Sequence, residues 1–318
     1  MATTLVDAYA RIHNYLRLSL TAKCNFKCTY CYTPDVKPPK AVPYQFMLRL
    51  VRLFASQGVN KVRLTGGEPL IHPNVVEIAR AVKSTPGINH LAITTNGLLL
   101  HRHLDGLLDA GLDSINLSLD TLVPAKFAFI SKVDGFQKVW RSFEECLGKL
   151  KSIKLNCVVM NGVNDDEILD FVELTRHNDF SMRFIEFVPY TGNQWNDKRF
   201  FPYKNIIETI EKKYKIERIN PQDPIARYYQ IEGFKGSLGV IASITEPFCD
   251  KCNRLRITAD GKFKVCLNSA REIDLNEEMT DEELIKVVKE ELLMKPKEHG
   301  GIKNMIGNGN RPMISIGG

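Results

Sequence analysis

The sequence predicts an α/β fold in which an open, partial barrel of parallel strands is followed by a smaller α+β part. Short β-like runs recur in the first two thirds of the chain, at residues 16–20, 61–65, 91–96, 114–120, 153–160 and 182–188. Helical periodicity separates most of them, for example over residues 44–58 and 74–84. Alternating strands and helices favour a parallel sheet. Six such units fit a partial (β/α)6 barrel better than an eightfold one, and a doubly wound sheet stays open as an alternative.

The pattern changes after about residue 200. A helix-like stretch over residues 203–216 leads to the Pro-rich joint NPQDP, and residues 226–243 then resemble short strands. Asp260-Gly261 is a hairpin signal further on. We therefore expect two units, residues 1–220 as the partial barrel and residues 221–318 as a smaller C-terminal domain.

Polar residues alternate with apolar ones along four of the predicted strands. Arg17 and Ser19, for example, alternate with leucines, whereas a parallel strand that is covered on both faces is nearly all apolar. If outer helices cover the apolar faces, the polar faces line an interior cavity that attracts a polyanion, and its basic residues include Arg17, Lys61, Arg63 and Lys154. The alternative is that these faces lie on the surface of an antiparallel sheet.

Composition excludes several classes of protein. Lysine and arginine exceed aspartate and glutamate by 43 − 37 = 6, which suits an anionic ligand but is too diffuse to indicate nucleic acid. No apolar run approaches the length that crosses a bilayer, so we expect no membrane insertion. The first residues resemble no targeting segment, which predicts a cytoplasmic protein, or one of the mitochondrial matrix if such a segment has been removed.

Six of the eight cysteines fall into two triplets, Cys24/Cys28/Cys31 and Cys249/Cys252/Cys266. Triplets in a chain without an export signal indicate metal rather than disulfides. Zinc sites usually have four ligands, whereas three thiolates on a four-iron cluster leave one iron open to another ligand. Zinc or plain thiols remain the alternatives. Cys146 and Cys157 lie in periodic apolar segments, and we expect both in the core.

The first triplet, with Tyr30 before its last cysteine, resembles the radical S-adenosylmethionine (SAM) superfamily, and TGGEP at residues 65–69 agrees. The resemblance implies a partial (β/α)6 barrel, a [4Fe-4S] cluster whose free iron is chelated by SAM, and a GGE loop beside the methionine end of SAM. The residues that match SAM contacts are Tyr30, Gly66, Gly67, Glu68 and Ser118. In physical terms, two glycines let the backbone come close to a ligand at the end of a parallel strand.

The second triplet, together with NRLR after Cys252, resembles the GTP 3′,8-cyclase family, also called molybdenum cofactor biosynthesis protein A. The resemblance extends from RIHNYLRLSLTAKCNFKCTYC to the terminal RPMISIGG. It implies a second [4Fe-4S] cluster with an open iron for guanine and basic side chains on the triphosphate. The matching substrate positions are Arg17, Arg63, Thr94, Lys154, Arg183, Arg254, Leu255 and Arg256, with Arg17, Lys154, Gly317 and Gly318 serving catalysis.

The resemblance also implies the reaction, in which an adenosyl radical takes hydrogen from ribose C3′ of GTP and the carbon radical attacks C8. The implied partners are GTP, an electron donor and a downstream cyclic pyranopterin monophosphate synthase, and a homodimer is one option. The sequence has no GxxxxGK[ST] loop, so arginines would hold the phosphates. Val188 replaces a methionine common in the family. Another radical SAM enzyme with an auxiliary cluster, or a non-catalytic zinc-stabilised protein, is the alternative.

Overall fold

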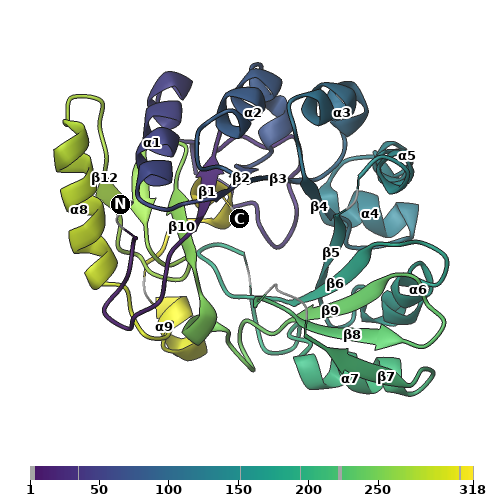
Figure 1. The fold of residues 1–318 in the computed structure, drawn as a ribbon. Helices are drawn as coiled ribbons and strands as arrows, with labels where there is room; N and C mark the ends of the chain where they lie inside the picture. The colour runs from purple at the N-terminus through teal and green to yellow at the C-terminus, as the bar shows by residue number, and fades with distance from the viewer. Residues whose placement is uncertain are drawn as a thin grey trace.

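The computed structural model describes residues 4–34, 36–150, 152–193, 195–220, 224–307 and 309–317. Within these ranges twelve strands form one curved sheet in the order β12-β11-β10-β1-β2-β3-β4-β5-β6-β9-β8-β7 (Figure 1). The first six are β1 (Tyr15–Ser19), β2 (Lys61–Thr65), β3 (His90–Thr95), β4 (Ser114–Ser118), β5 (Ile153–Val159) and β6 (Ser181–Glu186). They pair in parallel and in chain order. A doubly wound sheet requires a point at which the strand order reverses, and the order of these six strands never reverses. The partial-barrel prediction is therefore confirmed.

The later strands extend the same sheet at both ends. They are β7 (Ile216–Ile219), β8 (Arg227–Ile231), β9 (Ser237–Ile241), β10 (Arg254–Ile257), β11 (Lys262–Lys264) and β12 (Ile273–Asp274). β10 lies parallel to β1 and β9 parallel to β6, so the parallel part is longer than the six predicted strands. The division at residue 220 stays a prediction, and strands from beyond it flank the first six on both sides.

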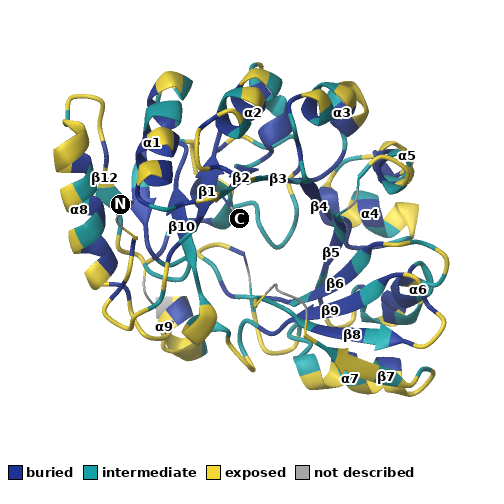
Figure 2. Cartoon of the chain, viewed as in Figure 1, coloured by how far each residue is buried: buried dark blue, intermediate teal, exposed yellow. Residues whose placement is uncertain are grey.

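Helices cover the outer side of the parallel strands (Figure 1). The helices of the described ranges are α1 (Tyr44–Ser56), α2 (Val75–Lys83), α3 (Leu100–Asp109), α4 (Pro124–Ser131), α5 (Phe136–Leu147), α6 (Ile168–Glu173), α7 (Tyr203–Glu211), α8 (Asp281–Leu293), α9 (Gly301–Gly307) and α10 (Met313–Ile316). The short α10 does not belong to this outer layer, because its residues Met313 and Ile314 line the inner cavity. Apolar residues recur every three or four positions in α1, such as Met47, Leu50 and Phe54, and this face is buried. Figure 2 shows the resulting pattern of buried strands and helices with exposed outer faces.

The main core lies between the helices and the apolar faces of the strands. Cys146 on α5 and Cys157 on β5 are each 1% exposed, which confirms that both are core residues. A helix is predicted over residues 203–216, but α7 ends at Glu211, and Ile216 is already the first residue of β7. Because the apolar faces point outwards to the helices, the polar faces of the strands turn inwards. None of the helices in the described ranges has the length and apolar character that a membrane span needs.

Candidate active site

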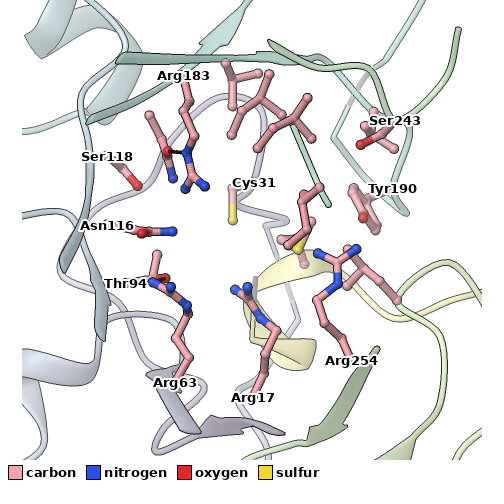
Figure 3. Close-up of a pocket in the computed structure, with 18 of the residues that line it drawn as sticks. Arg17, Cys31, Arg63, Thr94, Asn116, Ser118, Arg183, Tyr190, Ser243 and Arg254 are labelled. Atoms are coloured by element: carbon pink, nitrogen blue, oxygen red, sulfur yellow. Dashed lines mark hydrogen bonds between the residues drawn. The ribbon is translucent and has the colours of Figure 1, made fainter. Parts of the chain in front are cut away.

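A cavity of about 670 Å³ lies inside the curve of the sheet. Figure 3 shows side chains from several strands that converge on it. Most of the predicted site residues line this cavity: Arg17, Cys24, Cys28, Tyr30, Cys31, Arg63, Gly66, Gly67, Glu68, Thr94, Ser118, Lys154, Arg183, Cys249, Cys252, Arg254, Arg256 and Cys266. The fold thus brings together both cysteine triplets, which are more than 200 residues apart in the sequence, and the basic residues.

The first triplet lies on the loop that follows β1. Two backbone hydrogen bonds hold this loop against the end of α4, from Lys27 N to Ser131 O (2.9 Å) and from Thr29 N to Ile130 O (3.0 Å). Burial raises the pKa of Cys24 to about 11 and that of Cys31 to about 12. These thiols therefore stay protonated near neutral pH unless a metal stabilises their thiolates.

The donor set fits an iron–sulfur cluster better than a single ion. Soft thiolates favour iron–sulfur clusters, zinc or copper(I). In the described part of the chain, no three His, Cys, Asp or Glu side chains are arranged to hold one metal ion. A four-iron cluster needs no such arrangement, because each thiolate binds a different iron. Tyr30, which is part of the motif, donates a hydrogen bond of 2.8 Å from its hydroxyl to Asp120.

The GGE loop packs directly on the segment that leads into the first triplet. Gly67 N donates to Thr21 O (2.7 Å), and Glu68 N donates to Lys23 O (2.9 Å). A Cβ on Gly66 would lie 2.5 Å from Thr21 O, and one on Gly67 would collide with Lys23 O. The sequence predicts that these glycines let the backbone approach a ligand. The described contacts add another reason, because a side chain at either position would push the cysteine loop away.

Glu68 is buried at the end of this loop. Its carboxylate accepts hydrogen bonds from Leu70 N (3.0 Å), Thr95 Oγ1 (2.7 Å) and Asn96 N (2.7 Å). Burial raises its pKa to about 7, although these donors act in the opposite direction. The side chain of Asn96 donates to Cys24 Sγ (3.9 Å), so this network reaches the first triplet. Asn96 is not among the predicted site residues, and the sequence stretch TTNG around it is its only signal.

Three arginines lie side by side because of strand register. Arg17 on β1 pairs with Arg63 on β2 and with Arg256 on β10. Figure 3 shows the guanidinium groups of Arg17, Arg63, Arg183 and Arg254 pointing into the same space. Arg63 donates to Tyr15 OH and to Thr94 Oγ1 (3.4 Å), and Arg183 donates to Asn156 Oδ1 (2.8 Å).

The Nε atoms of Arg17, Arg254 and Arg256 are buried without a hydrogen-bond partner among the described residues. Burial, reinforced by neighbouring cations, lowers the pKa of Arg17 well below its usual value and that of Arg256 to about 10. Burial alone would raise the pKa of the Tyr15 phenol, but Arg63 and Arg17 lower it to about 7. A bound polyanion would relieve this crowding of positive charge.

The acidic side chains of the cavity wall already have other partners. Glu186 accepts hydrogen bonds from Tyr203 N (2.9 Å) and Ile244 N (2.8 Å), and Asp120 accepts from Val158 N (2.9 Å) and from Tyr30. Glu68 has the donors described above. The positive charge of the cavity therefore remains available to a ligand.

The second triplet lies across the cavity, beside β10. Lys295, which is buried, donates from Nζ to Cys252 Sγ (3.5 Å) and to Arg254 O (3.1 Å). Burial alone would raise the pKa of the Cys252 thiol, but Arg254 and Lys295 lower it to about 6. A thiolate at this position is the form that binds metal. No motif in the sequence points to Lys295.

Two of the predicted residues that the structure describes, Leu255 and Gly317, are not part of the cavity lining. Leu255 is fully buried in the core, so a substrate contact from it would come from the backbone. Gly317 lies against Ser19 and Thr65, at the ends of β1 and β2. Gly318 lies outside the described residues. Val188 lines the cavity, as does Tyr190, whose hydroxyl donates to Asn268 Oδ1 (3.2 Å) and which the sequence patterns do not single out.

The chain resembles known proteins over nearly its whole length. Residues 18–175 match the Radical SAM superfamily, and residues 180–301 match the family described as Molybdenum Cofactor Synthesis C. The chain is 43% identical to the mitochondrial GTP 3′,8-cyclase of Arabidopsis thaliana, covering 99% of this chain and 83% of that protein. It is 39% identical to the GTP 3′,8-cyclase of Chlorobaculum tepidum, covering 99% and 97%.

Some relatives are longer. Molybdenum cofactor biosynthesis protein 1 of Mus musculus is 44% identical over 98% of this chain, which spans about half (51%) of that protein. Among solved structures, Streptococcus suis SuiB bound to its precursor peptide SuiA gives a TM-score of 0.64 at 16% identity, covering 98% of this chain and 72% of SuiB. That likeness concerns the fold alone. The matches over the full chain, with the two triplets in one basic cavity, place this protein in the GTP 3′,8-cyclase family of the radical SAM superfamily.

Proposed function

We propose that this chain is a radical SAM lyase that converts GTP to (8S)-3′,8-cyclo-7,8-dihydroguanosine 5′-triphosphate, the first step of molybdenum cofactor biosynthesis. One observation carries the proposal. A single cavity has a thiol triplet on either side and, between them, buried guanidinium groups with unpaired Nε atoms. Such a cavity suits a substrate with a polyanionic end that is held between two metal clusters.

Each triplet would hold one [4Fe-4S] cluster, and SAM would be the second cofactor. When bound, the clusters would supply the electron that cleaves SAM and an open iron for the guanine. Gly66, Gly67 and Glu68 would contact SAM from the GGE loop. Tyr30 and Ser118 line the same cavity and would contact SAM from the cysteine loop and from β4.

The basic residues would bind and orient the triphosphate. Arg17, Arg63 and Arg256 lie side by side in neighbouring strands and would form forked contacts to phosphate oxygens. Lys154, Arg183 and Arg254 would add charge from other strands, with Thr94 and the Leu255 backbone as further contacts. Clamping the charged end restricts the ribose, which is what a hydrogen transfer between two bound molecules requires.

The partners and the compartment are part of the proposal. An electron donor would reduce the first cluster, and a cyclic pyranopterin monophosphate synthase would take the product. None of the eight cysteines, all of which lie in the described residues, forms a disulfide, which suits a reducing compartment such as the cytoplasm or the mitochondrial matrix. A homodimer is one option for the assembly.

The test uses the full chain purified without oxygen. We expect visible absorption from iron–sulfur clusters and about eight iron atoms per chain, because each of two clusters contains four. Incubation with GTP, SAM and dithionite should produce 5′-deoxyadenosine and the cyclised nucleotide, both measured by mass spectrometry. Zinc without iron would remove the enzyme hypothesis. Two clusters with 5′-deoxyadenosine but no product from GTP would favour a different radical SAM substrate.

A further inference from the structure

The C-terminal segment enters the cavity described above, and its last described residue, Gly317, lies beside the cavity wall. Met313 and Ile314 of α10 line the cavity, and Gly317 lies against Ser19 and Thr65. α10 has only four residues, and Gly317 N donates to Met313 O (3.1 Å). So short a helix cannot hold its own position, because helices below about 12 residues are marginal in water. The segment therefore needs an anchor elsewhere.

Arg311, just before α10, makes two ion pairs. Its guanidinium binds Asp260 in the turn between β10 and β11 (Nη1 to Oδ2, 2.8 Å) and Glu272 just before β12 (Nη2 to Oε2, 2.9 Å). Arg311 Nε also donates to Glu272 Oε1 (3.0 Å). The Arg311 side chain is 27% exposed, and those of Asp260 and Glu272 are 14% and 11% exposed. Paired contacts with an arginine fork are both stronger and more directional than a single surface ion pair.

Glu272 has a second cation, the Lys264 ammonium, which is fully buried. Lys264 Nζ donates to Glu272 Oε1 (2.9 Å), to Ser269 O (2.7 Å) and to Asn310 Oδ1 (3.1 Å). Asn310 Nδ2 in turn donates to Leu267 O (2.7 Å). Leu267 directly follows Cys266 in the sequence. The same buried cluster therefore holds the tail at residues 310–311 and the loop that begins with Cys266.

We propose that Asp260, Lys264, Glu272 and Arg311 form an ionic latch that positions the tail against the Cys266 loop, and that Arg311 is a positioning residue for the reaction. The proposal rests on the proposed function, because the reaction is what the position of the tail would serve. The latch has two effects. It keeps Gly317 beside β1 and β2, and it holds the Cys266 loop in place. Arg311 itself does not touch the reacting atoms.

Among the four residues of the latch, Arg311 is the one whose replacement should affect the tail without destabilising the rest of the fold. Without it, Glu272 keeps Lys264, and Asp260 keeps the Thr258 hydroxyl, which donates to Oδ1 (2.6 Å). Loss of Glu272 would instead leave the buried Lys264 ammonium without its ion pair and destabilise the fold. Loss of Lys264 would remove the donor to Ser269 O and Asn310 Oδ1 and so disturb the Cys266 loop itself. Arg311→Met is thus the informative variant, and Arg311→Lys keeps the charge but loses the fork.

The matched control is Lys262→Met. Lys262 on β11 pairs with Asp274 on β12, whose side chain is 74% exposed, so this variant loses an ion pair in the same region but none to the described part of the tail, and it leaves no buried charge unpaired. The first measurement is hydrogen–deuterium exchange of the C-terminal peptide in the full chain. Arg311→Met should raise exchange there at least tenfold and leave β1 and β2 unchanged. Arg311→Lys should be intermediate, and Lys262→Met should match the wild type.

The second measurement is turnover. Arg311→Met should lower kcat for cyclisation with little change in the KM for GTP, and should raise the ratio of 5′-deoxyadenosine to cyclised nucleotide. Wild-type exchange of the tail in Arg311→Met, or equal effects of Lys262→Met, would overturn the latch. If the tail exchanges faster in Arg311→Met but the ratio of 5′-deoxyadenosine to cyclised nucleotide stays at the wild-type value, the positioning role is overturned. If the wild type makes no cyclised nucleotide, the proposed function fails, while the exchange measurement still decides whether the latch exists.

Discussion

Arg17 lies at the centre of the basic wall, between Arg63 and Arg256 on the flanking strands. Its Nε is buried without a partner among the described residues, so binding there gains a charge-assisted contact without breaking another at this atom. A buried guanidinium with an unsatisfied donor is costly to the fold, and in this cavity a phosphate oxygen would satisfy it.

We expect Arg17→Met to weaken GTP binding by about 2 kcal/mol or more, because it removes one partner of a charge-assisted contact in a desolvated site. SAM affinity should change little. Isothermal titration calorimetry with each ligand separates the two effects. Arg52→Met, on the exposed side of α1, is the control for loss of one positive charge. Equal GTP affinity of Arg17→Met and the wild type would refute the polyanion cavity.

Gly317 is a second residue whose identity matters. Its φ is +84°, and a Cβ there would lie 2.8 Å from Ser19 Cβ and 2.9 Å from Thr65 Oγ1. Gly309 also has a positive φ, +67°, but nothing lies within 4 Å of a Cβ at that position. An alanine at either position would adopt an unfavourable positive φ, but only at position 317 would its Cβ collide with neighbouring atoms.

We expect Gly317→Ala to lower the rate of cyclisation strongly while cluster content and GTP affinity stay near wild type. The added methyl group displaces the tail from β1 and β2, and misplacement harms chemistry more than binding. Gly309→Ala should have a small effect. Single-turnover assays with product analysis measure both variants. Full activity of Gly317→Ala would mean that the tail tolerates displacement and does not orient the substrate.

At the scale of elements, the two cysteine loops should have separable roles. The loop after β1 lies beside the GGE loop and α4, whereas the second triplet lies beside β10 and Lys295. Because the loops pack on different elements, one can lose its cluster without unfolding the other. This separation is what allows the following test.

We expect Cys31→Ser to abolish 5′-deoxyadenosine formation, since three thiolates are needed to hold a cluster with one open iron. Cys266→Ser should retain it but lose the cyclised nucleotide. Cys146→Ser is the matched control, because Cys146 is buried on α5 and does not line the cavity. Each variant is reconstituted without oxygen and assayed for iron and both products. Normal cyclisation by Cys266→Ser would contradict a substrate role for the second triplet.

For the whole molecule, a polar network joins the N-terminal residues to distant segments around Cys249 and Pro296. Arg11 donates to Asp7 Oδ2 (2.6 Å), Cys249 O (2.7 Å) and Pro296 O (2.8 Å). His13, which is fully buried, contacts the same Asp7 oxygen (3.1 Å). Burial and the charge of Lys295 lower the pKa of His13 from 6.5 to about 4. The folded protein thus favours neutral His13.

This pKa shift predicts how stability depends on pH. A group with a lowered pKa in the folded state contributes stability above its unfolded pKa and loses it as pH falls. The free energy of unfolding should therefore fall between pH 6.5 and about 4, by at most about 3 kcal/mol from this group. Urea denaturation at several pH values measures the slope. His13→Gln should flatten it, whereas His177→Gln, outside this network, should not. An unchanged slope in His13→Gln would contradict this origin.

The sequence by itself determined the strand–helix alternation, the polar inner faces and the two metal-type triplets. These depend on local rules. Alternation along a strand decides which face a side chain takes, so the pattern around Arg17 and Arg63 is enough to place both on inner faces. The spacing of Cys24, Cys28 and Cys31 is likewise local. The same rules place Cys146 and Cys157 in the core, which their burial confirms.

Only the tertiary structure decided which of these local features meet. β10 lies next to β1 although more than 230 residues separate them, and that pairing puts Arg256 beside Arg17. Lys295 at Cys252 lies in no motif, and the stretch RPMISIGG, which begins with Arg311, does not reveal that Arg311 pairs with Glu272. A single buried contact leaves no periodic trace in a sequence. Short-range patterns report which way a side chain points, whereas its partner depends on chain packing over long separations, which pattern alone does not contain.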